Sequence, residues 1–196
     1  MPVTTLDPKS ALVVIDLQKS ILAYAQRPAS GGAPPTEGAE AVFRLAGQLT
    51  QAFRAKGLPV VLVNVAGVAP GRTEMPRRAG LVFPPEALEF VAELGQQPND
   101  IVVTKRTWGV FASTDIEKQL SELGVTQVVL CGISTTAGVE SSARQAYEAG
   151  FNVTLAIDAM MDMNEAAHAL TVTTIFPRLG ETGNTAEILA LLGTAA

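Results

Sequence analysis

Two charged side chains stand at the ends of apolar runs, where buried strands of a sheet would finish. Asp16 follows the run 11–15, and Lys105 follows the run 101–104. A carboxylate at the mouth of a sheet is buried enough to have a raised pKa, which suits it to proton transfer. A lysine at the end of a neighbouring strand would pair with it, hold it ionised and orient a substrate. The two residues predict an acid–base site, although an aspartate after a strand is also a common helix cap.

The segment from Leu130 to Gly150 has the layout of a junction built around a nucleophile: an apolar strand, a GISTT turn and a helix rich in small residues. In α/β enzymes such a junction presents reactive groups. Gly138 stands where we would expect a thiol, and glycine has no side chain to attack with. The only cysteine, Cys131, ends an apolar strand without a nearby cation or histidine in the sequence to lower its pKa, so we expect it in the core.

Short β-branched runs alternate with longer helical patterns, which is typical of a parallel sheet covered on both faces. The expected fold class is α/β, a three-layer α/β/α sandwich, Rossmann-like, with a mostly parallel six-stranded sheet in a single domain over residues 1–196. Strands are expected at Ala11–Ile15, Pro59–Asn64, Ile101–Thr104, Gln127–Cys131, Asn152–Ile157 and Pro177–Glu181. Helices are expected at Glu37–Lys56, from a capping box of Thr114 and Glu117 to near Gly124, at Ala137–Ala149, at Asn164–Ile175, and from Asn184 to Leu192.

Two stretches rich in glycine and proline, Arg27–Gly38 and Ala66–Pro85, interrupt this alternation. Both follow strands on the side where open parallel sheets bind ligands, so we expect binding loops there. The second stretch carries Arg72, Arg77 and Arg78, which would suit an anionic substrate or else be solvated loop charges.

The composition excludes several classes of protein. The 196 residues are 47% hydrophobic and 17% charged, with a formal net charge of −5, which argues against a nucleic-acid partner. The longest apolar runs have the length of strands rather than membrane spans, so no membrane partner is expected. The first residues lack a secretion signal, and we expect a cytoplasmic protein. A single cysteine excludes an intrachain disulfide and a multi-cysteine metal site.

Three blocks of the sequence resemble the isochorismatase-like, or cysteine hydrolase, superfamily. ALVVIDLQ (11–18) resembles the first strand with its catalytic aspartate, VVTKRTWGVFASTD (102–115) the third strand with its catalytic lysine, and residues 132–146 the nucleophile motif. The resemblance spans residues 11 to about 180. It implies a hydrolase with Asp16 and Lys105 as catalytic residues, a small-molecule substrate and a homodimer or larger homo-oligomer. The stretch NVAGVAPGRT lacks the histidines of nicotinamidase-like members, so no metal or other cofactor is expected.

Gly138 falls at the position of the superfamily's catalytic cysteine. Isochorismatases resemble this chain more closely here, because they also have glycine at that position and keep the aspartate and the lysine. In their chemistry the aspartic acid protonates a vinyl ether and water attacks the activated carbon. The resemblance thus implies acid-catalysed hydrolysis of a small, carboxylate-bearing substrate. Two alternatives stay open, namely an inactive binding or structural homologue, and an amidase with an unconventional nucleophile such as Thr135, Thr136 or Ser141.

The resemblance also implies a cis peptide bond between Ile133 and Ser134, followed by backbone amides that would bind an oxyanion or a substrate carboxylate. Trp108 and Phe111 would form an apolar wall of the pocket or pack in the core. His168, the only histidine, is expected on a helix surface or at an interface rather than as a metal ligand. The expected substrate-binding residues are Trp108, Phe111, Ile133, Ser134, Thr135, Thr136 and Ala137.

Overall fold

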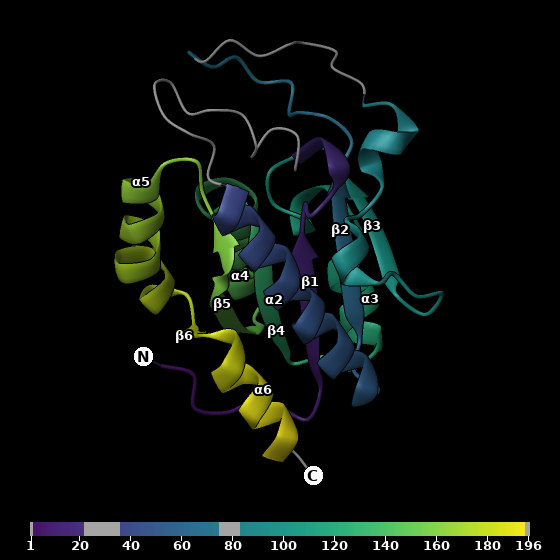
Figure 1. Ribbon diagram of the computed structural model, residues 1–196, viewed down its shortest axis with the longest axis vertical. Helices are drawn as coiled ribbons and strands as arrows, with labels where there is room; N and C mark the ends of the chain where they lie inside the picture. Colours follow the sequence, from purple (N-terminus) through teal and green to yellow (C-terminus); the bar gives the residue numbers. More distant parts are fainter. Residues whose placement is uncertain (1, 22–35, 75–82, 195–196) are drawn as a thin grey trace.

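The computed structural model describes residues 2–21, 36–74 and 83–194, and its centre is one sheet of parallel strands (Figure 1). The strand order is β3-β2-β1-β4-β5-β6. Each neighbouring pair is parallel, as expected. The strands are β1 (Ser10–Ile15), β2 (Val60–Val65), β3 (Ile101–Lys105), β4 (Gln127–Ile133), β5 (Asn152–Met161) and β6 (Glu181–Gly183).

Helices cover both faces of the sheet, which completes the predicted three-layer α/β/α fold (Figure 1). The helices are α2 (Thr36–Ala55), α3 (Ile116–Glu122), α4 (Glu140–Glu148), α5 (Glu165–Leu170) and α6 (Thr185–Thr194). Side chains of α2 and α6 share one core with the sheet, and side chains of α3 and α4 share the other. Single π-helical turns at Thr135–Val139 and Thr171–Ile175 adjoin α4 and α5, and short 3-10 turns lie at Pro85–Leu88, Ala92–Leu94, Phe111–Ser113 and Phe176–Arg178.

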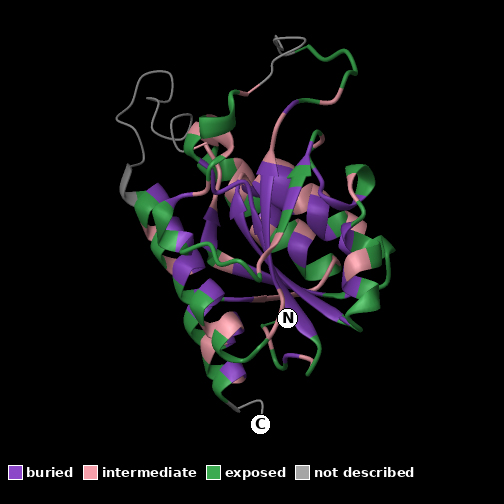
Figure 2. Cartoon of the chain, turned by 90° about the vertical axis from the view of Figure 1, so that its right-hand side faces the viewer, coloured by how far each residue is buried: buried purple, intermediate pink, exposed green. Residues whose placement is uncertain are grey.

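Burial on both faces explains why the strands are continuously apolar in sequence. All six residues of β1 are buried; Leu12 and Val14 join the core under α2, whereas Val13 and Ile15 join the core under α3 and α4. Side chains alternate across a strand, so a strand covered on two sides needs apolar residues at every position. Figure 2 shows the resulting layer of buried strands between helices that are exposed on their outer sides.

The chain order of the strands places a ligand-binding position at the end of β1. β2 and β3 extend the sheet to one side of β1, and the chain then returns to pair β4 with the other side. Ligands of open parallel sheets bind beside the carboxyl ends of the strands, where the direction of strand addition reverses. The ends of β1 and β4 therefore define the expected site, with the end of β3 two strands away from β1.

The last strand differs from its prediction. We expected it at 177–181, but residues 176–178 form a 3-10 turn and β6 covers only Glu181–Gly183. Pro177 has no backbone N–H and a fixed φ, which suits the start of a helical turn and leaves it unable to donate to a strand ladder. Gly180 then passes so close to β5 that a Cβ there would lie 2.0 Å from the Val153 carbonyl oxygen.

The helix starts were predicted with mixed success. The N-cap of α3 is Asp115 rather than Thr114, and it makes no capping bond; the Thr114 hydroxyl instead accepts the Ile116 amide at 3.3 Å. Asn164, the first residue of the predicted helix 164–175, is the N-cap of α5. Its side chain accepts a hydrogen bond from the Ala167 amide at 3.0 Å. Asn184 forms a capping box before α6, exchanging bonds of 2.9 and 2.8 Å with Glu187.

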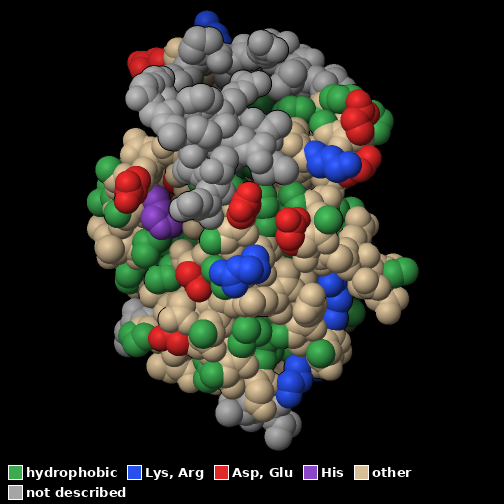
Figure 3. Space-filling view, in the orientation of Figure 1, with side chains coloured by type: hydrophobic (Ala, Val, Ile, Leu, Met, Phe, Trp, Pro, Cys, Tyr) green, Lys and Arg blue, Asp and Glu red, His purple; other side chains and the backbone are tan. Residues whose placement is uncertain are grey.

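The surface of the described residues carries charges of both signs. In the view of Figure 3, acidic and basic side chains lie interspersed among polar and apolar ones, without a patch of one sign. No helix within residues 2–21, 36–74 and 83–194 is long and apolar enough to cross a membrane.

Candidate active site

Asp16 lies directly after β1, at the carboxyl edge of the sheet. Its amide donates to the Val63 carbonyl at 2.9 Å, which extends the pairing with β2 by one residue. Its φ of +56° is in the left-handed region, which an aspartate tolerates better than most residues and which turns the side chain away from the strand direction. Only 5% of Asp16 is exposed. The strand end therefore holds a buried carboxyl group in one orientation.

Lys105, the last residue of β3, reaches this carboxylate across β2. Its Nζ lies 2.7 Å from Asp16 Oδ2 and also donates to the carbonyl oxygens of Thr107 at 3.1 Å and Trp108 at 2.6 Å. The predicted ion pair is confirmed. An ammonium group has three N–H donors, so these three bonds occupy all of them. Lys105 is therefore equipped to hold and charge-stabilise Asp16, and it has no donor left for a substrate.

The two oxygens of Asp16 have different surroundings. Oδ2 accepts from Lys105, whereas Oδ1 is buried and has no hydrogen-bond partner among the described residues. Burial raises the pKa of the Asp16 carboxyl from 3.8 to about 6, although the charge of Lys105 and its hydrogen bond oppose the rise. A proton on this group would sit on Oδ1, because Oδ2 is held by the ammonium. Burial and the ion pair thus give a carboxyl group with a raised pKa and one unpaired oxygen, which are the properties expected of a proton donor.

Gly138 faces this carboxylate from the turn after β4. A Cβ built on Gly138 would lie 3.1 Å from Asp16 Oδ2 and 2.8 Å from Ile15 Cγ2. The peptide bond between Ile133 and Ser134 is cis, as predicted, and the π-helical turn Thr135–Val139 follows it. The turn therefore brings its backbone against the Asp16 carboxylate at the one position that lacks a side chain.

The other side of this turn is held by residues from the end of β5 and from α5. Asp162 Oδ2 accepts from the Thr136 amide at 2.9 Å and from the Thr136 hydroxyl at 2.6 Å, and the Thr135 hydroxyl lies 2.8 Å from His168 Nδ1. Burial would raise the pKa of Asp162, but its hydrogen bonds, chiefly from Thr136, together lower it. Local sequence patterns do not predict these two contacts, because 26 and 33 residues separate the partners along the chain.

The backbone amides of the turn are less available than predicted. Besides the Thr136 amide, the amides of Ala137 and Val139 are already bonded, both to the Ser134 carbonyl at 3.2 Å. Thr136 and Ala137 therefore cannot present these amides to a substrate without breaking existing bonds. Ile133 and Thr135 are buried, at 3% and 0% exposure.

The aromatic residues of the lysine segment have separate roles. Trp108 is 57% exposed, and its carbonyl oxygen binds Lys105. Phe111 is buried in the core, where its ring lies 5.9 Å from that of Phe151. Phe111 is therefore a packing residue of the core under α3 and α4, to which the exposed Trp108 does not belong.

Cys131 is a core residue. It has no exposed surface and belongs to the core under α2, whereas Val139, next to Gly138, belongs to the opposite core. Burial, together with the charge of Asp158, raises the pKa of its thiol to about 12. Only the thiolate is nucleophilic, so this cysteine is inert as a nucleophile at neutral pH.

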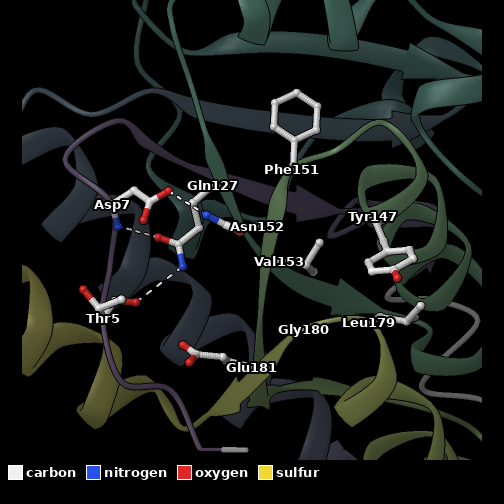
Figure 4. Close-up of a pocket in the computed structure, with 10 residues that line it drawn as sticks. All are labelled: Thr5, Asp7, Gln127, Tyr147, Phe151, Asn152, Val153, Leu179, Gly180 and Glu181. Carbon is white, nitrogen blue, oxygen red and sulfur yellow. Dashed lines mark hydrogen bonds between the residues drawn. The ribbon is translucent and has the colours of Figure 1, made fainter.

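Two cavities lie at the opposite, amino-terminal edge of the sheet. One of about 310 Å³ is lined by the first residues of β4 and β5, and one of about 570 Å³ by the first residues of β2 and β3. In the first, shown in Figure 4, Asp7 accepts from Asn152, and Gln127 accepts from the Asp7 amide and donates to the Thr5 carbonyl. Neither cavity contains Asp16 or Lys105.

The family model named "Isochorismatase domain" matches residues 10–187, which include Asp16, Lys105 and Gly138. The chain belongs to the isochorismatase family. It is 40% identical to the isochorismatase family protein YecD of Escherichia coli O157:H7, over 93% of this chain and 96% of that one. It is also 38% identical to YwoC of Bacillus subtilis, over 92% of this chain and 93% of the relative. The structure of an isochorismatase family protein from Burkholderia thailandensis superimposes with a TM-score of 0.85 at 38% identity, covering 96% and 98% of the two chains.

Members of the isochorismatase family are hydrolases, so the predicted fold and enzyme class are both confirmed. Arg72, from the predicted binding loop, is exposed, whereas Arg77 and Arg78 lie outside the described residues. Most of the stretch Arg27–Gly38 also lies outside them. Among the residues that the structure describes, no group of three or more His, Cys, Asp or Glu side chains is placed to hold a metal ion.

Proposed function

We propose that this isochorismatase-family hydrolase works without a thiol nucleophile and cleaves a small, carboxylate-bearing substrate, with Asp16 as proton donor. The observation that carries the proposal is the buried Asp16 carboxyl, which is unpartnered at Oδ1 and held at Oδ2 by Lys105, with Gly138 beside Oδ2 where a nucleophilic side chain would otherwise stand. In this proposal Gly138 fills the position of the family's catalytic cysteine.

The chemistry that fits this arrangement is hydrolysis of an enol ether. Protonated Asp16 donates its proton from Oδ1 to the terminal vinyl carbon, and the adjacent carbon becomes an oxocarbenium ion. Water attacks that carbon and returns a proton to the Asp16 carboxylate. The hemiketal then breaks its C–O bond and releases an alcohol and a ketone. Each turnover consumes one water and leaves Asp16 protonated, so no covalent intermediate and no oxidant are needed.

Lys105 contributes to this cycle through Asp16. Its ammonium stabilises the carboxylate that forms after proton donation, and its bonds to the Thr107 and Trp108 carbonyls keep it in place. Without the ammonium, Asp16, at 5% exposure, would be a weaker acid, because burial disfavours the carboxylate that forms when it donates its proton. The pair thus keeps the pKa of Asp16 near the working pH, where a group can both give and recover a proton.

A second candidate is an amidase that uses Thr135 as nucleophile, because His168 Nδ1 lies 2.8 Å from its hydroxyl. A histidine bonded to a hydroxyl is the arrangement that activates such nucleophiles. Two observations weigh against it. Thr135 is fully buried, and its hydroxyl is bonded toward α5, which lies on the opposite side of the molecule from β3 and Lys105 (Figure 1).

The test compares enol ethers with amides on the purified protein. Isochorismate and chorismate are enol ethers of pyruvate, and their hydrolysis is followed by coupling released pyruvate to lactate dehydrogenase; nicotinamide and N-carbamoyl amino acids are followed by ammonia release. We expect pyruvate release that survives Thr135→Val but falls by about 10²- to 10⁴-fold in Asp16→Asn, as loss of a general acid does. Asp115→Asn, at an exposed aspartate on α3, is the matched control.

Three outcomes decide between the candidates. Ammonia release that is lost in Thr135→Val would establish the amidase. Pyruvate release that is unchanged in Asp16→Asn would remove Asp16 from the chemistry. Binding of these carboxylates without turnover of any enol ether or amide would favour the inactive homologue.

A further inference from the structure

Ser142, on the first turn of α4, makes two hydrogen bonds that local sequence patterns do not predict. Its hydroxyl donates to the Gly138 carbonyl at 2.7 Å and accepts from the Val110 amide at 3.2 Å. Ser142 has no exposed surface, and Val110 has none either. A buried hydroxyl that is satisfied in both directions fixes the separation of its two partners, because breaking either bond leaves a buried polar group unpaired.

The two partners of Ser142 belong to the two halves of the active site. Gly138 lies in the turn that faces the Asp16 carboxylate. Val110 lies two residues beyond Trp108, and the carbonyls of Thr107 and Trp108 accept two of the three bonds of the Lys105 ammonium. One hydroxyl thus ties the backbone in front of Asp16 to the segment that holds the partner of Asp16.

Gln145, one turn further along α4, strengthens the same connection. Its Oε1 accepts from the amides of Phe111 at 3.0 Å and Ala112 at 3.3 Å. Gly109 lies against this side chain so closely that a Cβ there would be 2.2 Å from Oε1. Four backbone groups of the two segments are therefore bonded to two side chains of α4, although neither side chain contacts Asp16 or Lys105.

We propose that Ser142, assisted by Gln145, is a positioning residue that sets the Lys105 ammonium and the Gly138 turn at their working distance on either side of the Asp16 carboxylate. Only the expected change in kcat rests on the proposed function; the hydrogen bonds of Ser142 do not depend on the substrate. When the link is broken, the lysine segment loosens, Lys105 holds Asp16 less closely, and the carboxylate that forms after proton donation is less well stabilised.

The Asp16 carboxyl reports this change because Lys105 dominates its charged surroundings. Lys105 is the charged side chain that contacts Asp16 among the described residues. The turn Thr135–Val139 and strand β2 carry no charged residue. Arg106 lies with its side chain beside Gly67, and Glu140 at the start of α4 is bonded to Arg144 and Thr171. Because burial raises the pKa of Asp16 and Lys105 lowers it, hydration of a loosened site would lower the pKa, so an upward shift reports displacement of Lys105.

The experiment compares Ser142→Ala with Ser121→Ala, the same substitution at an exposed serine of α3. Three kinds of measurement are made on the folded proteins: enol ether kinetics giving kcat and KM, the titration midpoint of Asp16 by carboxyl carbon NMR, and hydrogen exchange of the Val110 amide. For Ser142→Ala we expect kcat to fall by about 10- to 100-fold with KM changed less than about threefold. We also expect an upward shift of the Asp16 midpoint and faster exchange at Val110. Ser121→Ala should match the wild type in all three.

Three further variants separate positioning from plain stability. Ser142→Thr keeps the hydroxyl and Ser142→Val has the same shape without it, so recovery in the first alone would assign the effect to the hydrogen bonds. Gln145→Ala, at a half-buried position, should shift the same quantities in the same direction, and it keeps the test decisive if Ser142→Ala does not fold.

The outcomes distinguish this inference from the proposed function. A Ser142→Ala protein that melts earlier but keeps the wild-type kcat and Asp16 midpoint would overturn the positioning role, with Ser142 then a structural residue only. A shifted midpoint and faster exchange at Val110, in a protein that hydrolyses no enol ether, would support the link and refute the proposed reaction. If the Asp16 midpoint is unchanged in both Ser142→Ala and Gln145→Ala, the link has no support.

Discussion

Raising the pH through the pKa of Asp16 should switch off hydrolysis if this residue donates the proton. The pKa is raised to about 6 by burial, against the attraction of Lys105. Protonated Asp16 then falls from about half of the molecules at pH 6 to about 1% at pH 8. We therefore expect kcat/KM to be constant below about pH 5 and to fall about 50-fold between pH 6 and pH 8.

Removing the positive charge of Lys105 should shift the pH dependence of kcat/KM. Lys105→Met takes away the group that favours the Asp16 carboxylate, so the pKa of Asp16 should rise and the falling limb should move to higher pH. Lys118→Met, at an exposed lysine of α3, controls for loss of one charge from the chain and should leave the limb in place. The measurement is pyruvate release from an enol ether in buffers of constant ionic strength, with stability checked at each pH.

A profile of the opposite sense would refute this reasoning. If Asp16 must be ionised before chemistry, as a base would be, kcat/KM rises with pH and reaches its plateau above about pH 6. A limb that stays at the same pH in Lys105→Met would show that a different group titrates.

Four further outcomes follow from the structure. Folding raises the pKa of Asp16 above 3.8, so its contribution to stability is complete below pH 3.8 and is lost as the pH rises through about 6. In urea unfolding, the free energy of unfolding of the wild type should therefore change by about 3 kcal/mol over this range, and this change should be absent from Asp16→Asn. Hydrolysis should survive iodoacetamide and Cys131→Ser, whereas inactivation with label on Cys131 would make that residue the nucleophile. Gly138→Ala should lower the free energy of unfolding by about 1–3 kcal/mol, because its Cβ would lie 2.8 Å from Ile15 Cγ2; denaturation equal to the wild type would contradict the close fit. Light scattering should find an assembly larger than the 20.5 kDa chain, as its exposed apolar side chains suggest, and a monomer at micromolar concentration would refute this.

The main features of the fold could be predicted because they depend on local patterns. β1, β2 and β4 are mostly apolar because they are buried on both faces, whereas the edge strand β3 alternates between buried and exposed residues. The sixth was placed too early, because β6 has only three residues and is specified by its pairing with β5 rather than by its own sequence. The cap at Asn164 was predicted correctly, whereas at Thr114 the hydroxyl bonds the first amide of α3 and Asp115 takes the N-cap position.

The sequence by itself determined which groups are available for chemistry: Asp16 and Lys105 at the ends of parallel strands, glycine at 138, and a cysteine inside an apolar strand. Parallel strands end at the same edge of a sheet, so the ends of β1 and β3 share one edge, with β2 between them. Only the tertiary structure decided how these groups are held. The bonds of Ser142 to Gly138 and Val110, and of Thr135 to His168, join segments 4, 32 and 33 residues apart. The two longer connections depend on how helices pack against the sheet, which local propensity does not specify.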